Sequence, residues 1–340
     1  IEAAAAYSLR NLSDSYAGSV VEVRRNTDGA LNDFKASEVT DGTLAAWVNT
    51  SFANALPLDT AGAAAAAYSL RNLSSSYTGS VVEVRRGSDG NTESFTAVEV
   101  TDGTLVAWVG AGNDGTVSKW YDQSGNDNHA VQTDAAKQPK IVDGGSLVVG
   151  GLDFDGTDDG LAVSGQVLIS SSFFTTSVIR HDTGTSTSDG QNVFGQYQVG
   201  VSGRFQLSAN SANQYSFFAN ATDSIVGFNT GAIGTSQTLI SVNANGSNAE
   251  IFRDGTSKAT DTYSGFTPAT VDFTIGIDAG GEREFNGKIQ ELIIYPTDQS
   301  DKRRAIEENI GSNYGITLTS SKDGTVSKWY DQSTTSGVPN

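Results

Sequence analysis

Short stretches of alternating apolar and polar residues fill the middle of the chain, from about residue 140 to residue 295. They are rich in Val, Ile, Phe, Tyr and Thr, and turns such as Asp155-Gly156 and Asn245-Gly246 separate them. This period of two predicts β-strands. Many short strands with glycine-rich turns are typical of a sandwich or jelly roll. Strands are expected within 147–154, 161–169, 173–179, 193–201, 204–208, 214–218, 238–244, 249–255, 271–277 and 288–295.

A helical spacing follows the last of these strands. Ala305, Ile306 and Ile310 recur on one face. Ser300 is a suitable N-cap and Gly311 a suitable stop. We therefore expect one short helix that packs against the sandwich.

Two segments near the N-terminus repeat one another at an offset of 61 residues. Residues 6–48 and 67–109 are identical at 32 of 43 aligned positions. Each copy opens with alanines that favour a helical turn, continues through a strand with alternating valines, and turns at an Asp-Gly pair. Internal repeats of this kind indicate a duplicated structural module.

The two copies differ in their last strand. Copy two continues into DGTVSKWYDQS at residues 114–124, whereas copy one runs into residues 49–62, which read as a linker. The same eleven residues recur without change at 323–333. One module is therefore split between the two ends of the chain. Its missing strand leaves an open edge, and we expect residues 323–333 to fill such an edge.

The C-terminal strand has two possible acceptors, its own N-terminal module or that of a neighbouring molecule. We favour the neighbour. If each C-terminal strand adds to the module of a neighbouring molecule, the contact is head-to-tail and produces a filament. A decayed duplication with an unused tail is the plainer alternative. The expected donor residues are Thr325, Val326, Lys328, Trp329, Tyr330 and Asp331, and the expected acceptor residues are Tyr7, Leu9, Leu12, Val21, Val23 and Trp47.

These patterns divide the chain into four parts. Residues 1–50 are expected to form the strand-deficient module and residues 51–62 the linker. Residues 63–316 are expected to form the jelly roll, including repeat copy two and the terminal helix, and residues 317–340 the donor strand.

Charge and composition exclude several classes of protein. With 39 acidic and 21 basic residues the net charge is −18, which disfavours nucleic acid and anionic membranes. No apolar run is long enough for membrane insertion. The chain has no cysteine and two histidines, which excludes disulfides, thiolate chemistry and histidine-rich metal sites. Its richness in Ser, Thr, Asn, Gly and Asp favours an extracellular protein of a cell or virion surface.

Two groups of motifs resemble known families. FDGTDDGLAV at 154–163 and the segment 285–316 resemble the concanavalin A-like lectin/glucanase jelly roll, in its LamG-like branch. Residues 66–86 and the WYDQSGNDNHAVQ element resemble the first strands of the family-54 α-L-arabinofuranosidase catalytic domain. Similar segments occur in phage tail and surface proteins. The resemblance implies an all-β jelly-roll sandwich with short peripheral helices, beside which we place the small split repeat module.

The resemblance also implies an active site, which the sequence does not complete. Retaining glycoside hydrolysis uses two carboxylates. The resemblance places the acid at Asp278, and the nucleophile near Gly195 and Gln196. No Asp or Glu occurs from residue 190 to residue 222. We therefore expect no catalytic residue and no enzyme, with Asp278 as a strand-end turn residue. His129 and His181 are expected to be polar turn residues.

Two further groups of residues have candidate chemistry. The carboxylates Asp153, Asp155, Asp158 and Asp159 could bind Ca²⁺, although we favour the interpretation that they form a hairpin turn; no other cofactor is expected. The four tryptophans could stack on sugars, although we favour core packing as their role. The leading hypothesis is a non-enzymatic extracellular subunit that polymerises with itself. The alternatives are a carbohydrate-binding module or adhesin, and an arabinofuranosidase-like glycoside hydrolase.

Overall fold

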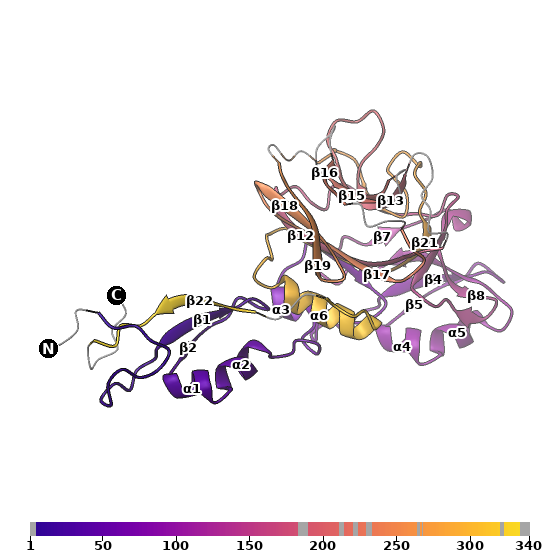
Figure 1. Ribbon diagram of the computed structural model, residues 1–340. Helices are drawn as coiled ribbons and strands as arrows, with labels where there is room; N and C mark the ends of the chain where they lie inside the picture. The colour runs from indigo at the N-terminus through magenta and orange to yellow at the C-terminus, as the bar shows by residue number, and fades with distance from the viewer. Residues whose placement is uncertain are drawn as a thin grey trace.

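The structure of the chain is a computed structural model, and it describes residues 5–182, 190–210, 214–219, 224–228, 233–263, 266, 268–319 and 323–333. A two-layered body with a long helix at its base carries a smaller lobe on one side (Figure 1). The described residues nearest to the two ends of the chain both belong to this lobe. The all-β jelly-roll prediction is confirmed.

The smaller lobe is the split module, which we define as residues 5–50 with residues 323–333. Its three-stranded sheet has the order β2-β1-β22, from β1 (Val21–Arg25), β2 (Leu31–Phe34) and β22 (Gly324–Trp329). The short helices α1 (Ala36–Thr40) and α2 (Thr43–Val48) cover one face. Its small core of buried side chains comprises Tyr16, Val20, Val21, Val23, Phe34 and Val48.

The second repeat copy forms the complete module, residues 64–124, whose strands join the body directly. It contains β3 (Ala66–Ser69), β4 (Val82–Arg86), β5 (Thr92–Phe95) and β6 (Gly115–Trp120). The helices α4 (Ala97–Thr101) and α5 (Thr104–Val109) follow β5. The alanine-rich start of this copy is therefore a strand, because β3 pairs with β21 of the body, and the predicted helical turn is wrong there.

One layer of the body is a long antiparallel sheet. Its strands are β12 (Ser172–His181), β17 (Thr238–Asn245), β18 (Asn248–Arg253), β19 (Thr256–Thr262) and β21 (Asn286–Tyr295). The strand β10 (Leu152–Asp155) pairs with β21 at its edge.

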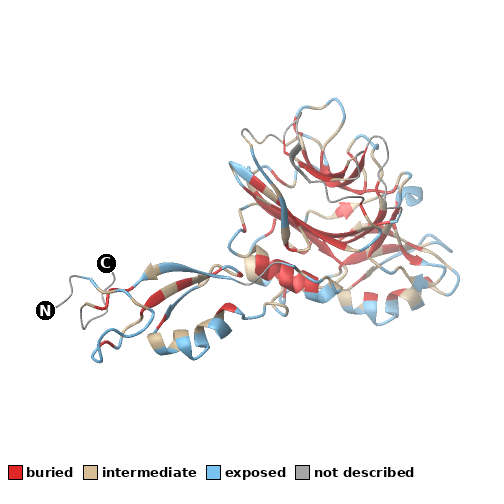
Figure 2. Cartoon of the chain, in the orientation of Figure 1, coloured by how far each residue is buried: buried red, intermediate tan, exposed pale blue. Residues whose placement is uncertain are grey.

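The facing layer contains β11 (Leu161–Val163), β13 (Gln191–Gln196), β14 (Phe205–Ala209), β15 (Tyr215–Phe218), β16 (Ser224–Phe228) and β20 (Phe273–Ile275). The short strands β7 (Ala130–Val131), β8 (Lys140–Asp143) and β9 (Ser146–Leu147) join this layer to β6 of the complete module. Apolar side chains from both layers form the main core, and burial is concentrated between them (Figure 2). Phe173 of β12 meets Phe205 of β14 edge to face at 5.5 Å between ring centroids.

The terminal helix α6 (Arg303–Tyr314) packs against the long sheet through Ile306 and Ile310. It begins three residues after the predicted N-cap Ser300, and its own N-cap is Lys302. It also continues through Gly311 and ends at Gly315, whose left-handed backbone (φ 67°) suits a helix C-cap. The region expected to be only a linker contains one helical turn, α3 (Pro57–Ala61). None of the described helices is long and apolar enough to cross a membrane.

Strand β22 pairs with β1 of its own chain, although we expected the neighbour's module. The pairing repeats the register of β6 on β4, and both contain a shift at the same place, between Glu22 and Val23 in β1 and between Glu83 and Val84 in β4. The chain after α6 is therefore long enough to return to the split module, and a second molecule is not needed to complete its sheet.

We expect equivalent tryptophans of the two modules to differ in their effect on stability. Trp120 is fully buried and Trp329 is 50% exposed. Trp120→Ala should lower the free energy of unfolding by about 3–5 kcal/mol, the usual range for a buried aromatic, and Trp329→Ala by roughly 1 kcal/mol. Urea unfolding of both variants, with amide exchange to separate the two lobes, measures this. Equal losses would contradict the difference in burial.

Candidate functional site

The C-terminal segment of the split module reproduces the hydrogen bonds of the complete module. The Gln332 side chain accepts from the Leu12 amide at 2.9 Å, as the Gln123 side chain accepts from the Leu73 amide at 2.9 Å. The Ser327 hydroxyl lies 2.8 Å from the carboxylate of Glu22, and the equivalent Ser118–Glu83 distance is 2.7 Å. The predicted donor and acceptor segments therefore meet, within one chain.

Individual predicted residues of this interface lie as follows. Trp329 lies opposite Val21 and beside the ring of Tyr7, with 6.2 Å between ring centroids. The Tyr330 hydroxyl donates to Asp33 at 2.7 Å, and Asp331 accepts the amide of Ala6 at 2.8 Å. Thr325, Val326 and Lys328 lie on β22, and Val23 lies on β1. Leu9 lines the groove described next, Trp47 packs against the small core, and Leu12 contacts the C-terminal segment through its amide.

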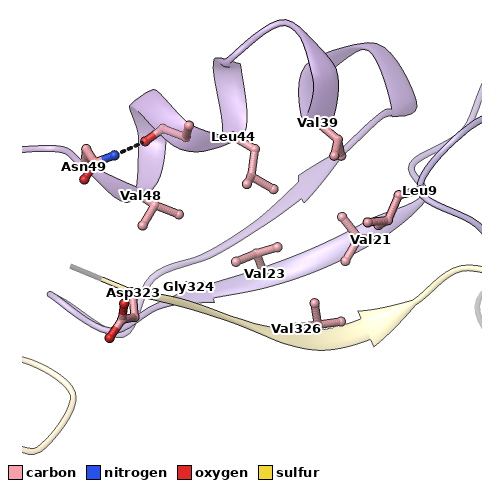
Figure 3. A pocket seen from close by; sticks show the side chains of 11 residues that line it. Leu9, Val21, Val23, Val39, Leu44, Val48, Asn49, Asp323, Gly324 and Val326 are labelled. Carbon is pink, nitrogen blue, oxygen red and sulfur yellow. Dashed lines mark hydrogen bonds between the residues drawn. The ribbon is translucent and has the colours of Figure 1, made fainter. Parts of the chain in front are cut away.

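An open apolar groove of about 380 Å³ lies between α2 and the sheet of the split module. Figure 3 shows valines of β1 and Val326 of β22 on one side and side chains of α1 and α2 on the other. It is lined by Leu9, Val21, Val23, Val39, Leu44, Ala45, Val48, Asn49, Asp323, Gly324 and Val326. An apolar hollow beside an edge strand is suited to binding another β-segment.

A second candidate site lies on the jelly roll, at the loop after β20. The Asp278 carboxylate accepts the amides of Gly280 and Glu282, each at 2.9 Å. Its other oxygen lies 3.7 Å from the Nε of Arg283. Burial raises the pKa of Asp278 above its usual value. Arg283 has a left-handed backbone (φ 62°), which is unusual for a residue with a side chain and is found most often at functional sites.

Aromatic and guanidinium groups extend this site outward from Asp278. The guanidinium of Arg204 lies 4.1 Å from the ring centre of Tyr197 and 3.5 Å from that of Phe218. The guanidinium of Arg283 lies 5.1 Å from the Tyr197 ring. Burial lowers the pKa of Arg204 to about 10, so this residue is still cationic at neutral pH. Two cations therefore flank one half-buried tyrosine ring.

Polar side chains of β13 and β14 hold this arrangement in place. Arg204 donates to Gln206 at 2.7 Å, and Gln206 donates to Asn192 at 2.6 Å. Asn192 in turn donates to the carbonyl of Ile277, the residue before Asp278, at 2.7 Å. The loops that carry Tyr197, Arg204 and Arg283 are thus tied to strands β13 and β14, which favours binding with little loss of conformational freedom.

The strands that face Asp278 place no carboxylate at the position the resemblance requires. Gln196 is fully buried, and its amide group binds the backbone of Val167 and Leu168. Gly195 lies so close to β14 that an added Cβ would be 2.4 Å from the carbonyl oxygen of Phe205. Both residues are therefore structural. Asp278 is a turn residue, as expected, but it is buried beside two arginines.

The predicted Ca²⁺ ligands divide into two groups. Ligand atoms of Asp155, Asp158 and Asp159 lie within 4.8 Å of one another. Asp153 instead forms an ion pair with Lys288 at 2.8 Å. Asp155 accepts the backbone amide of Thr157 at 2.8 Å, which is the hydrogen bond of a simple turn. Ca²⁺ binding here remains a prediction.

Only one of the two histidines lies where the sequence predicted. His181 is the last residue of β12 and is buried between the rings of Tyr215 and Phe285, which lowers its pKa to about 4. His129 accepts the amide of Asp122 at 3.1 Å, so it has a structural hydrogen bond. The prediction of a turn position is wrong for His181, because strand β12 extends two residues beyond its apolar pattern, whereas His129 lies in a loop as predicted.

Sequence reasoning did not find Tyr197, Arg204 and Arg283. They come from two loops about 80 residues apart, so no local spacing connects them. The one available signal was the basic residue two positions after the Gly280-Gly281 pair.

Two protein-family models match the chain. Residues 155–303 match the model described as the concanavalin A-like lectin/glucanases superfamily. Residues 58–206 match the model of the catalytic domain of α-L-arabinofuranosidase B. No curated protein sequence matches the chain.

Solved structures give the same picture of the fold. A GH54 α-L-arabinofuranosidase soaked with a cyclic sulfate inhibitor is similar at 17% identity and a TM-score of 0.54, over 73% of this chain and 62% of that one. An arabinofuranosidase complexed with arabinofuranosyl-α-1,2-xylobiose gives 17% identity and 0.53, over 76% and 64%.

These matches bear out the resemblance noted in the sequence and define a concanavalin A-like fold. The body of the chain therefore has a lectin-like or glycosidase-like fold. The matched region covers less than two thirds of the length of the arabinofuranosidase chains.

The carboxylate cluster generates a prediction about pH. Burial, and then the charges of Asp155, Asp158 and Asp153, raises the pKa of Asp159 to about 7, from an unfolded value of about 4. Protonated Asp159 favours the folded state, so this contribution is complete below about pH 4 and is lost as the pH rises through about 7. The difference in urea midpoint between Asp159→Asn and the parent should therefore grow in favour of the variant from pH 4 to pH 8. A constant difference would contradict the raised pKa. Added Ca²⁺ should stabilise only the parent at pH 8 if the cluster binds the ion.

Proposed function

We propose that the protein is a non-enzymatic, extracellular glycan-binding module, and that Tyr197, Arg204 and Arg283 form its binding surface. The observation that carries the proposal is the Tyr197 ring flanked by the guanidinium groups of Arg204 and Arg283, with buried Asp278 beside Arg283. Aromatic faces stack on sugar rings, and arginine forks donate paired hydrogen bonds to carboxylates and hydroxyls. The matches to lectin-like and arabinofuranosidase families support a carbohydrate as the ligand.

The chemistry of the site supports binding more than hydrolysis. A glycosidase of the retaining type needs a second carboxylate about 5 Å from the acid. Gln196 and Gly195 stand where the resemblance places it, and residues 190–222 contain no Asp or Glu. An amide can neither attack the anomeric carbon nor stabilise the positive charge that develops there. Asp278 instead holds Arg283 in place.

Binding to a glycan array that includes uronic-acid and neutral sugars tests this function. Tyr197→Ala and Arg204→Ala should each weaken binding at least about tenfold, because each removes one side of the stack. Tyr7→Ala, which removes an exposed tyrosine of the split module, is the matched control and should bind normally. Binding that is unchanged in both site variants would overturn the proposal.

A chromogenic arabinofuranoside separates binding from catalysis. We expect no turnover by the parent chain above that of Asp278→Asn. Turnover that Asp278→Asn abolishes would show that the chain is a glycosidase and that another carboxylate supplies the nucleophile.

A second function is favoured by the split module, namely assembly into head-to-tail filaments. Strand β22 makes the same contacts whether the acceptor β1 belongs to its own chain or to a neighbour, so exchange between copies costs little enthalpy. Its side chains are also mostly exposed, in contrast with those of β6. Copies that exchange β22 would form a self-assembled fibre at a cell or virion surface.

Concentration and truncation test this assembly. Incubation at high protein concentration, with exchange promoted by mild urea, should yield filaments visible by electron microscopy. Removal of residues 321–340 should leave monomers, because the truncated chain has no strand to donate. Filaments from the truncated chain would rule out exchange of β22.

A further inference from the structure

The split module exposes a surface that its repeat buries. Val326 is 59% exposed and Trp329 is 50% exposed, whereas their equivalents Val117 and Trp120 are fully buried. Tyr7 is 46% exposed, whereas its equivalent Tyr68 is fully buried. The sequences are the same at these positions, so the difference comes from what lies against them. A contiguous exposed apolar surface of this kind marks an interaction site.

The complete module shows what covers this surface. In that module β6 pairs on its outer edge with β7 and β8, and the Val117 amide donates to the carbonyl of Pro139 at 2.8 Å. In the split module β22 is the outer strand of the sheet. An edge strand with alternating Val and Trp is a template for another strand.

The missing contact can be located at a single residue. A Cβ placed on Gly115 would meet Val84 and Val109 of its own module. It would also lie 3.2 Å from Val142, which belongs to β8. A Cβ placed on the equivalent Gly324 would meet Val23 at 2.8 Å and Val48 at 2.9 Å, and then only the backbone of the next strand. The position of Val142 thus has no counterpart beside Gly324, and the open groove lies there.

Charge gives a second requirement for the occupant. In the complete module Asp114 forms an ion pair with Lys140 of β8 at 3.0 Å and accepts the amide of Gly144 at 2.8 Å. The equivalent carboxylate, Asp323, lines the groove of the split module. An occupant that matches the complete module would carry a lysine before its inward-facing valine and a glycine turn after it, as in the sequence PKIVDGG at 139–145.

We propose that this groove and the outer edge of β22 bind a β-hairpin of the β7–β8–β9 type, presented by the jelly-roll body of a partner polypeptide. The chain cannot supply the hairpin from its own body, because its β7 and β8 are already paired with β6. A second folded copy is excluded for the same reason: Ile141 and Val142 are fully buried in each copy. The partner is thus a protein with the same kind of body and an uncovered module-binding edge.

A peptide of residues 128–149, which contains β7, β8 and β9, tests the proposal with the full chain. The peptide should bind, shift the emission of Trp329 to the blue, and slow amide exchange at Val326 about tenfold. Val326→Asp places a charge in the groove and should abolish binding. Val98→Asp, at a valine that is 64% exposed outside the groove, is the matched control and should bind normally.

A covalent graft keeps the test decisive if the free peptide does not form a hairpin. In this variant a copy of residues 125–149 replaces residues 334–340, so that it follows β22 as the original follows β6. Protection of β22 in the graft, together with peptide binding, supports the proposal. If β22 is protected in the graft but the free peptide does not bind, the proposal that a separate partner supplies the hairpin is overturned. If neither the graft nor the free peptide protects β22 from amide exchange, the hairpin is not the occupant. The same conclusion follows if the parent chain self-associates and Val326→Asp removes that association.

Discussion

The central strand of each repeat module needs a hydrogen-bonded neighbour on both edges, and this requirement determines how the chain is arranged. The hairpin supplies one neighbour locally, through the turns at Asp28-Gly29 and Asp89-Gly90. The other neighbour must come from the sequence GTVSKW, which lies nearby for β4 and about 300 residues away for β1. Unpaired buried amides and carbonyls cost several times the net value of a hydrogen bond, so the distant strand returns to the split module.

The two modules show how far identical residues depend on their surroundings. Both contain an arginine stacked on a tryptophan, Arg25 on Trp47 at 4.5 Å and Arg86 on Trp108 at 4.6 Å. Both also contain the same edge-to-face contact of that tryptophan with a phenylalanine, at 5.3 Å and 5.4 Å. These local contacts follow directly from the shared sequence. Burial of the outer strand does not, because it needs the jelly-roll body that lies against only one of the modules.

Sequence patterns predicted most of the fold because the contacts within a strand or hairpin follow directly from the local sequence. Within a strand, apolar and polar residues alternate, so the aromatic and β-branched side chains lie on the face that enters the core. Ten such segments correspond to strands of the body. The exact repeat at 323–333 predicted the pairing of β22, since identical residues satisfy an identical edge. The start of β3 was missed because alanine favours helices by itself, and only pairing with β21 makes Ala66 and Ala67 extended.

The candidate glycan site was harder to predict. Asp278 was found through a resemblance, but its burial, and its arginine neighbours, depend on how two distant loops meet. The interpretation of Gln196 as a lost catalytic position also gains a physical reason from the structure, because its amide fastens the 167–168 segment. Residues that hold loops together by backbone contacts have no periodic signal in a sequence.

The position of Val21 directly opposite Trp329 has a mechanical consequence. The chain enters β1 and leaves β22 at the same end of the pair, so tension applied across these two residues loads the hydrogen bonds one after another, as in a zipper. Such geometry yields at low force. The body lies between these two strands in the sequence, so the closed pair shields it, and it carries the load only after the small lobe has opened.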